Sequence, residues 1–127
     1  MGKATYQSYR EQSVMTMTTV EMLTLLYDGI LKEVSLVKKA FGAEPRDYSA
    51  INNRLQKVHI ILNHLKYNLD MKYDVAKNLF SLYDYFSWIV IQANTKKDPS
   101  RLDEIIDMVG ELKESYKQAD KKVRMHA

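Results

Sequence analysis

The chain is expected to be all-α, an antiparallel up-down four-helix bundle with a short N-terminal arm. Only four glycines and two prolines interrupt its 127 residues. Four long segments place apolar residues three or four positions apart, which is the spacing of one helix face, and no segment alternates as a strand does. Short connections between such segments favour antiparallel neighbours. We expect the arm over residues 1–17 and the bundle over 18–127, with helices at about 19–41, 48–70, 75–94 and 99–122.

The first two helices have recognisable ends. Thr18 and Glu21 form a capping-box pattern before the first helix, and Gly42 is expected to end it. Asp47 is a good N-cap for the second helix. The core stripe of the first helix is Leu23, Leu26, Tyr27, Ile30, Val34, Val37 and Phe41. The seam of the second helix is Ile51, Leu55, Val58, Leu62, Leu65 and Leu69.

The third helix, which Asp74 is expected to cap, is apolar on more than one side. Its core stripe is Leu79, Tyr83, Phe86, Val90 and Ala93. Four more apolar or aromatic residues then point sideways or outward, namely Phe80, Tyr85, Trp88 and Ile91. Small soluble proteins rarely expose that much apolar surface without a use for it. The third helix is therefore either covered twice within the fold or is a docking surface.

The fourth helix is amphipathic. Asp98 and Pro99 provide an N-cap and a first-turn proline. The core face is predicted to carry Leu102, Ile105, Val109, Leu112, Tyr116, Ala119 and Val123. The opposite face is acidic, as expected of a solvated exterior.

Composition excludes several classes of protein. The chain has no cysteine, which removes thiol chemistry, disulfides and cysteine-bound zinc. It shows neither a signal peptide nor an apolar run of about 20 residues, so we expect a cytoplasmic protein without membrane insertion. The net charge of +3 comes from scattered lysines rather than a basic stripe, so no nucleic-acid partner is expected.

Residues that could support catalysis or hold a metal are sparse. Di-metal bundles use Glu-x-x-His pairs, and the sequence contains none. Asp28 and Asp84 each follow a core tyrosine, so we expect them to face solvent or a phenol of a neighbouring helix. His59 and His64 are expected to be exposed polar residues. We therefore predict no enzyme, no metal and no cofactor.

Two further faces are unusually free of charge. The outer face of the second helix carries Asn53, Gln56, Ile60, Asn63 and Tyr67. The first helix has a second apolar strip of Met22, Leu25, Gly29, Leu36 and Ala40. A glycine within a helix costs about 1 kcal/mol relative to alanine, which suggests a close approach of another backbone. Each face alone fits internal packing as well as a partner groove, but the three together favour partner binding.

The arm carries enough apolar surface to lie in a groove. Its candidate contact residues are Tyr6, Tyr9, Val14 and Met15. The alternative is a solvated tail, which the two tyrosines disfavour.

Over roughly residues 5 to 119 the chain resembles the FliS family of flagellin-specific export chaperones. The resemblance is carried by Tyr9, Gln12-Ser13-Val14 and Thr16, then Leu23-Thr24-Leu25-Leu26-Tyr27-Asp28-Gly29, Leu79, Leu82-Tyr83-Asp84-Tyr85 and Ala93-Asn94. Three features depart from the family pattern. Met71-Lys72-Tyr73 replaces a glycine-rich turn, Ser87-Trp88-Ile89 replaces an arginine pair, and Tyr116 replaces a tryptophan.

The resemblance implies a bundle that binds the disordered C-terminal segment of newly made flagellin, prevents premature polymerisation and delivers the subunit for flagellar type III export. It implies no nucleotide and no metal, and it implies an arm that competes for part of the binding surface. Other flagellar regulators or an export-gate component are further candidate partners.

Combined with the uncharged faces, this gives a set of candidate contacts. Helix-in-groove anchoring would use Met22, Leu25, Gly29, Leu36, Ile60 and Tyr67, with Tyr85 and Trp88 as aromatic anchors. A self-associating structural or adaptor bundle, such as a homodimer, is the leading alternative; an enzyme or metal protein and a nucleic-acid binder rank behind it.

Overall fold

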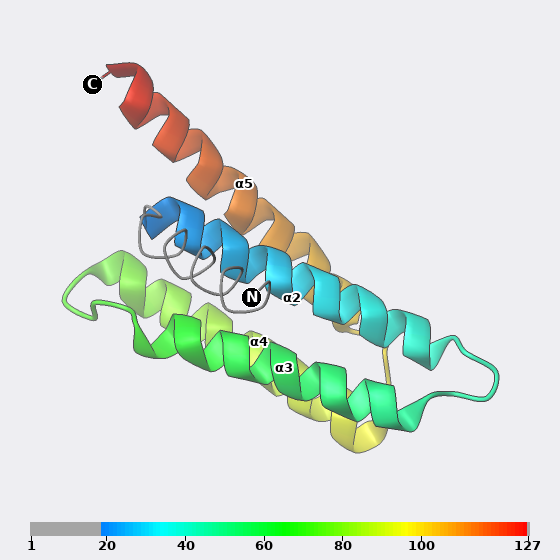
Figure 1. Cartoon of the computed structure of the whole chain (residues 1–127). Coiled ribbons are helices and arrows are strands. Elements are labelled where there is room, and N and C mark those ends of the chain that lie inside the picture. Colours follow the sequence, from blue (N-terminus) through cyan, green and yellow to red (C-terminus); the bar gives the residue numbers. More distant parts are fainter. Residues whose placement is uncertain (1–18, 127) are drawn as a thin grey trace, which may run out of the picture.

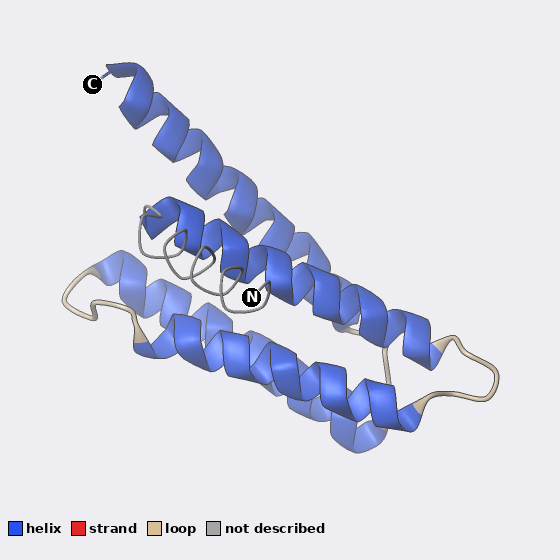
Figure 2. Cartoon of the chain, in the orientation of Figure 1, coloured by secondary structure: helices blue, strands red, loops and turns tan. Residues whose placement is uncertain are grey.

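The structure is a computed structural model, and it describes residues 19–126 except for the side chains of residues 124 and 126. Four helices follow one another, α2 (Thr19–Phe41), α3 (Tyr48–Tyr67), α4 (Asp74–Lys96) and α5 (Leu102–His126). Successive helices run in opposite directions (Figure 1). Within the described range all regular structure is helical (Figure 2). The predicted all-α bundle is confirmed; the arm at residues 1–17 lies outside the described residues.

Most of the core is the apolar seam that the periodicity predicts, with Ile89 of α4 added and Leu23, Leu26 and Leu79 only partly buried at its edge. Tyr27, Ile30, Val34 and Val37 of α2 are fully buried. From α3, Ile51, Leu55, Val58, Leu62 and Leu65 join them; from α4, Tyr83, Phe86, Ile89, Val90 and Ala93; from α5, Leu102, Ile105 and Val109. Burial of these side chains is the main favourable term that holds the four helices together.

The end of α2 and the start of α3 lie where the sequence predicts them. α2 ends at Phe41, and the Gly42 N–H donates to the Lys38 carbonyl at 3.1 Å. The Asp47 carboxylate accepts a hydrogen bond from the Ala50 N–H at 3.0 Å, as an N-cap does. α3 stops at Tyr67 rather than at residue 70, because Asn68 forms the C-cap and its side-chain amide donates to the His64 carbonyl at 2.7 Å.

Two N-cap predictions were wrong. Asp74 is the first residue of α4, and the extended Tyr73 occupies the N-cap position. Asp98 caps a turn instead of α5, since its carboxylate accepts from the Ser100 N–H at 3.0 Å. α5 then begins at Leu102, whose N–H donates to the Pro99 carbonyl at 3.1 Å.

The predicted core stripe of α5 holds only as far as Tyr116. Ala119 is exposed, and Val123 is 69% exposed. The reason is the offset between helices, because the last turns of α5 extend beyond the start of α2 (Figure 1). No other helix within residues 19–126 covers that end.

Ion pairs link the helices at the surface of the core. Asp28 accepts from Lys113 on α5 at 2.6 Å, and Asp84 accepts from Lys66 on α3 at 2.6 Å. The Asp28 and Asp84 side chains are 51% and 57% exposed, so both face solvent as expected, and each also pairs with a lysine of a neighbouring helix. Lys66 is 8% exposed and its ammonium group lies 5.7 Å from the Phe80 ring centroid. Its long stem fills an apolar position while the charge reaches a carboxylate.

Candidate docking surfaces

A groove runs along the seam between α3 and α4. We call it the α3–α4 groove; it is lined by Leu55, Gln56, His59, Ile60, Val90, Ile91 and Asn94. Its volume is about 320 Å³, and none of these side chains is acidic or a lysine or arginine. Leu55 and Val90 are buried at its base, whereas Ile60 and Ile91 are 66% and 49% exposed at its edges. Apolar walls with a few amides suit the apolar face of a helix.

A second groove lies on the other side of α3. This α2–α3 groove, of about 330 Å³, is lined by Gly29, Lys32, Glu33, Lys57, Ile60 and Ile61. A methyl group added at Gly29 would lie 3.2 Å from Ile61 Cδ1, so the close neighbour of the glycine is a side chain of α3 and not the backbone that the sequence suggests. Ile60 lines both grooves and forms the ridge between them.

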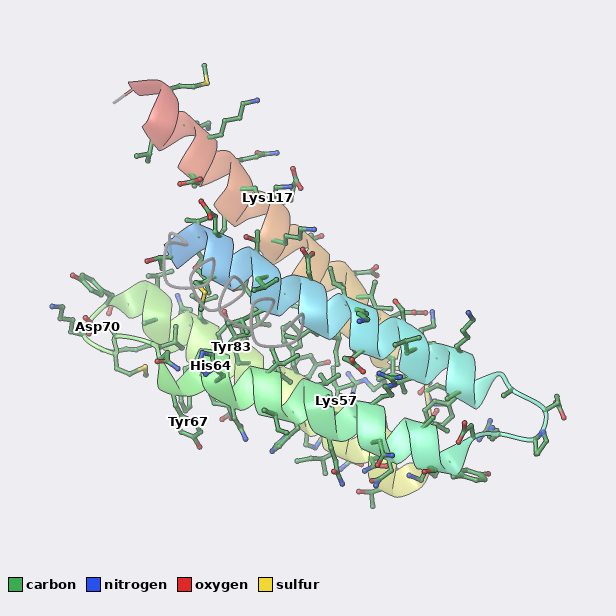
Figure 3. The ribbon with its side chains drawn as sticks, in the orientation of Figure 1. Lys57, His64, Tyr67, Asp70, Tyr83 and Lys117 are labelled. Carbon is green, nitrogen blue, oxygen red and sulfur yellow. The ribbon has the colours of Figure 1, made fainter. Side chains whose placement is uncertain are left out.

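The Glu33 carboxylate in the α2–α3 groove is paired with an arginine of α3. Glu33 is 8% exposed, and both of its oxygens accept from Arg54 Nη1, at 3.2 and 3.3 Å. Lys32 and Lys57 stand at the edge of the groove, and Lys57 is labelled on α3 in Figure 3. The α2–α3 groove therefore offers peripheral cations beside an apolar wall.

A third concave surface lies at one end of the bundle. The bundle-end hollow, of about 410 Å³, is lined by Thr19, Met22, Leu23, Leu26, His64, Leu65, Asn68, Leu69, Asp70, Leu79, Tyr83 and Tyr116. All four helices contribute to it, and Figure 3 labels three of its residues, His64, Asp70 and Tyr83. All five leucines of this hollow belong to the core stripes that the sequence predicts, because periodicity gives the face of a helix but not its distance from the end of the bundle.

The aromatic residues of α4 form a cluster with the start of α5. The rings of Tyr85 and Trp88 stack, with centroids 6.2 Å apart and an interplanar angle of 17°. The Arg101 guanidinium lies 5.0 Å from the Trp88 ring centroid and donates to the Tyr85 hydroxyl at 2.6 Å. That hydroxyl donates to Glu104 at 3.1 Å. Tyr85 is therefore held in place by polar contacts, while Trp88 stays 45% exposed.

The structure separates the predicted contact residues into groups. Gly29 and Ile60 meet in the α2–α3 groove, Met22 lies in the bundle-end hollow, and Tyr85 stacks on Trp88. Three others line none of the concave surfaces described above: Leu25 and Tyr67 are 49% and 75% exposed, and Leu36 is half-buried. Tyr6, Tyr9, Val14 and Met15 lie outside the described residues.

Two residues that line the α3–α4 groove, Ile91 and His59, are not among the contact residues that the sequence predicts. Ile91 was recognised only as an outward-pointing residue, although it shares the exposed side of α4 with Trp88. His59 is not the exposed polar residue expected, because it is half-buried and its Nδ1 is buried without a hydrogen-bond partner within residues 19–126. His64 is exposed, as predicted.

Neither a metal site nor a membrane-spanning helix is found in the described part of the chain. Among the side chains that the structure describes, no group of three or more acidic or histidine residues could hold a metal ion. None of the four helices has the length and apolar content needed to cross a membrane.

Comparison with known proteins identifies the family of this chain. A family model described as flagellar protein FliS matches residues 2–123. The chain belongs to the FliS family. Two FliS relatives, each named flagellar secretion chaperone, are 32% identical to it: the Bacillus subtilis (strain 168) protein over 114 residues, covering 90% of this chain and 84% of the relative, and the Salmonella typhimurium (strain LT2) protein over 123 residues, covering 94% and 90%.

The fold of the chain is also seen in a solved structure. A crystal structure of a flagellar chaperone from bacteria superimposes with a TM-score of 0.77 at 20% identity, covering 96% of this chain and 99% of the other. The relatives' names are those of chaperones, not of enzymes.

Proposed function

We propose that the chain is a cytoplasmic export chaperone that binds the disordered C-terminal segment of flagellin, prevents premature polymerisation and delivers the subunit for flagellar type III export. The observation that carries the proposal is the pair of grooves on either side of α3, which share the exposed Ile60. FliS membership and the relatives' names as flagellar secretion chaperones support it. The proposed function gives no residue a catalytic role.

The binding mode follows from the shape of the grooves. A disordered segment that forms short amphipathic helices would bury its apolar residues against Ile60 and Ile91, and this burial offsets the entropy lost on ordering. Gly29 would form, together with Ile61 that packs against it, part of the wall that the segment contacts in the α2–α3 groove. Trp88 is the stronger aromatic anchor, since the Tyr85 hydroxyl is already engaged by Arg101. Met22, Leu25, Leu36 and Tyr67 would extend the contact.

The direct test is a calorimetric titration of the protein with a peptide of about 40 residues from the C-terminus of its own flagellin. We expect one-to-one binding, with a dissociation constant in the micromolar range or tighter and a negative heat-capacity change, because apolar surface is buried. Folded protein that binds neither the peptide nor intact flagellin would contradict the proposal.

The same exposed residues could instead join two copies of the chain, with Ile60 and Tyr67 buried in the contact. Light scattering distinguishes this function from the first. A stable dimer that flagellin peptide leaves unchanged would favour a self-associating bundle, whereas a one-to-one complex would favour the chaperone. An export-gate component or another flagellar regulator would then remain to be tested as a second partner.

The arm is proposed to cover part of the binding surface through Tyr6 and Tyr9. A variant that lacks residues 1–17 is expected to bind the flagellin peptide about threefold more tightly or better, because a competing segment has been removed. Titration calorimetry measures the change, and circular dichroism checks that the helices persist. The full chain with Tyr6→Ala and Tyr9→Ala should show the same direction; unchanged affinity in both variants would rule out the cap.

A further inference from the structure

Two buried phenols lie beneath the bundle-end hollow. Tyr27 of α2 and Tyr83 of α4 are 0% and 1% exposed, and their hydroxyl oxygens are 2.6 Å apart. One hydrogen bond between two hydroxyls uses one of their two protons, so the other proton still needs an acceptor. Within residues 19–126 neither hydroxyl has a second partner. A buried donor without an acceptor is unfavourable, which points to a further binding group.

The position of the two rings indicates which proton is spare. Tyr83 lines the bundle-end hollow, whereas Tyr27 does not. If Tyr27 donates to Tyr83, the Tyr83 proton is the one that can reach the hollow. Burial is the main cause that raises the pKa of both phenols; donation to Tyr83 raises the pKa of Tyr27 further, and acceptance from Tyr27 lowers that of Tyr83. Both hydroxyls therefore keep their protons at neutral pH.

The walls of the hollow restrict what the acceptor can be. Leu23, Leu65 and Leu79 form an apolar surface around Tyr83. A carboxylate carried into such a surface would lose its hydration, and Asp70 at the same hollow would repel it. A backbone carbonyl at the end of a short helix, or the oxygen of a serine, threonine or amide side chain, meets neither penalty.

We infer that Tyr83 is a specificity-determining residue, whose hydroxyl donates a hydrogen bond to an uncharged acceptor on an apolar stretch of the flagellin segment seated in the bundle-end hollow. The inference rests on the proposed function and adds to it the chemistry that this part of the segment must have. A segment with apolar residues but no free acceptor would leave the donor unpaired and bind less well.

The experiment compares full-length variants in the same peptide titration. Tyr83→Phe removes the proposed donor and is expected to weaken binding about three- to tenfold, the effect of one neutral hydrogen bond. Tyr48→Phe is the matched control, because it removes the same hydroxyl from a ring that is 54% exposed and lines none of the three concave surfaces. Its affinity should equal that of the wild type.

A double variant separates binding from folding. Tyr83→Phe alone strands the Tyr27 hydroxyl, whereas Tyr27→Phe with Tyr83→Phe removes both polar groups and is expected to restore thermal stability. The double variant should still bind as weakly as Tyr83→Phe. Proton NMR gives a second readout, since a hydroxyl resonance that peptide protects from exchange in the wild type should be absent from Tyr83→Phe.

Each of the remaining possible results would overturn either the inference or the proposed function. Equal affinities for Tyr83→Phe and Tyr48→Phe would overturn the inference. Tighter binding by Tyr83→Phe would also overturn it, because the acceptor would then belong to residues 1–18, which compete with the peptide. Failure of the wild type to bind would reject the proposed function itself, so the two ideas fail by different results.

Discussion

Replacing both Ile60 and Ile91 by aspartate is expected to abolish binding of the flagellin segment while the bundle stays folded. The two side chains are 66% and 49% exposed at the edges of the α3–α4 groove, so their removal leaves the core intact. Burying a large aliphatic side chain contributes about 1.5–3 kcal/mol, and a carboxylate forced against Leu55 and Val90 adds a desolvation penalty. We expect the affinity to fall at least about 100-fold in titration calorimetry.

Val123→Asp is the matched control for this double variant. Val123 is 69% exposed and lines neither groove, so the same change of a branched aliphatic residue to a carboxylate tests charge and solubility without touching the α3–α4 groove. Its affinity should match that of the wild type, and the melting temperatures of all three proteins should be similar. Wild-type affinity in the Ile60 and Ile91 variant would remove the α3–α4 groove from the binding surface.

Phe86→Ala is expected to give the largest loss of stability, about 3–5 kcal/mol in the free energy of unfolding. Phe86 is 0% exposed in the centre of α4, and truncation leaves a cavity between helices that cannot close without moving their backbones. Urea denaturation followed by circular dichroism measures the change.

Trp88→Ala provides the comparison on the same helix. The indole is 45% exposed and contacts Tyr85 and Arg101 at the surface, so its loss should cost about 1 kcal/mol of stability. Binding of the flagellin peptide should nevertheless weaken. If Trp88→Ala were as destabilising as Phe86→Ala, Trp88 would be a structural residue and not an anchor for a partner.

Helix phase was enough to predict most of the side chains that face the core, although it left out Ile89 and placed Ala40 on an outer strip, and both are buried. Tyr27, Phe86 and Val109 are buried and Ile60 and Trp88 exposed, as a period of 3.6 residues requires. The ends of α5 were not predictable in this way. The Asp98 carboxylate can accept a backbone hydrogen bond at a turn as well as at a helix end. The exposure of Val123 depends on how far α5 extends beyond the start of α2.

The concave surfaces depend on contacts between helices that are distant in sequence. Ile60 borders two grooves only because Gly29 on α2 and Ile91 on α4 flank α3 from opposite sides. The burial of Lys66 depends in the same way on Asp84 and Phe80 of another helix. A single sequence gives the face of each helix but not its neighbour at each level, so the candidate residues could be named and their grouping could not.

The shared position of Ile60 constrains the path of any bound chain. The two grooves lie on opposite sides of α3, and a straight helix laid along one of them cannot enter the other. A segment that fills both must leave one groove, cross over α3 and enter the second. Such a segment needs two short helical pieces joined by an extended or turning linker, and a rigid continuous helix of the same composition would occupy only one groove.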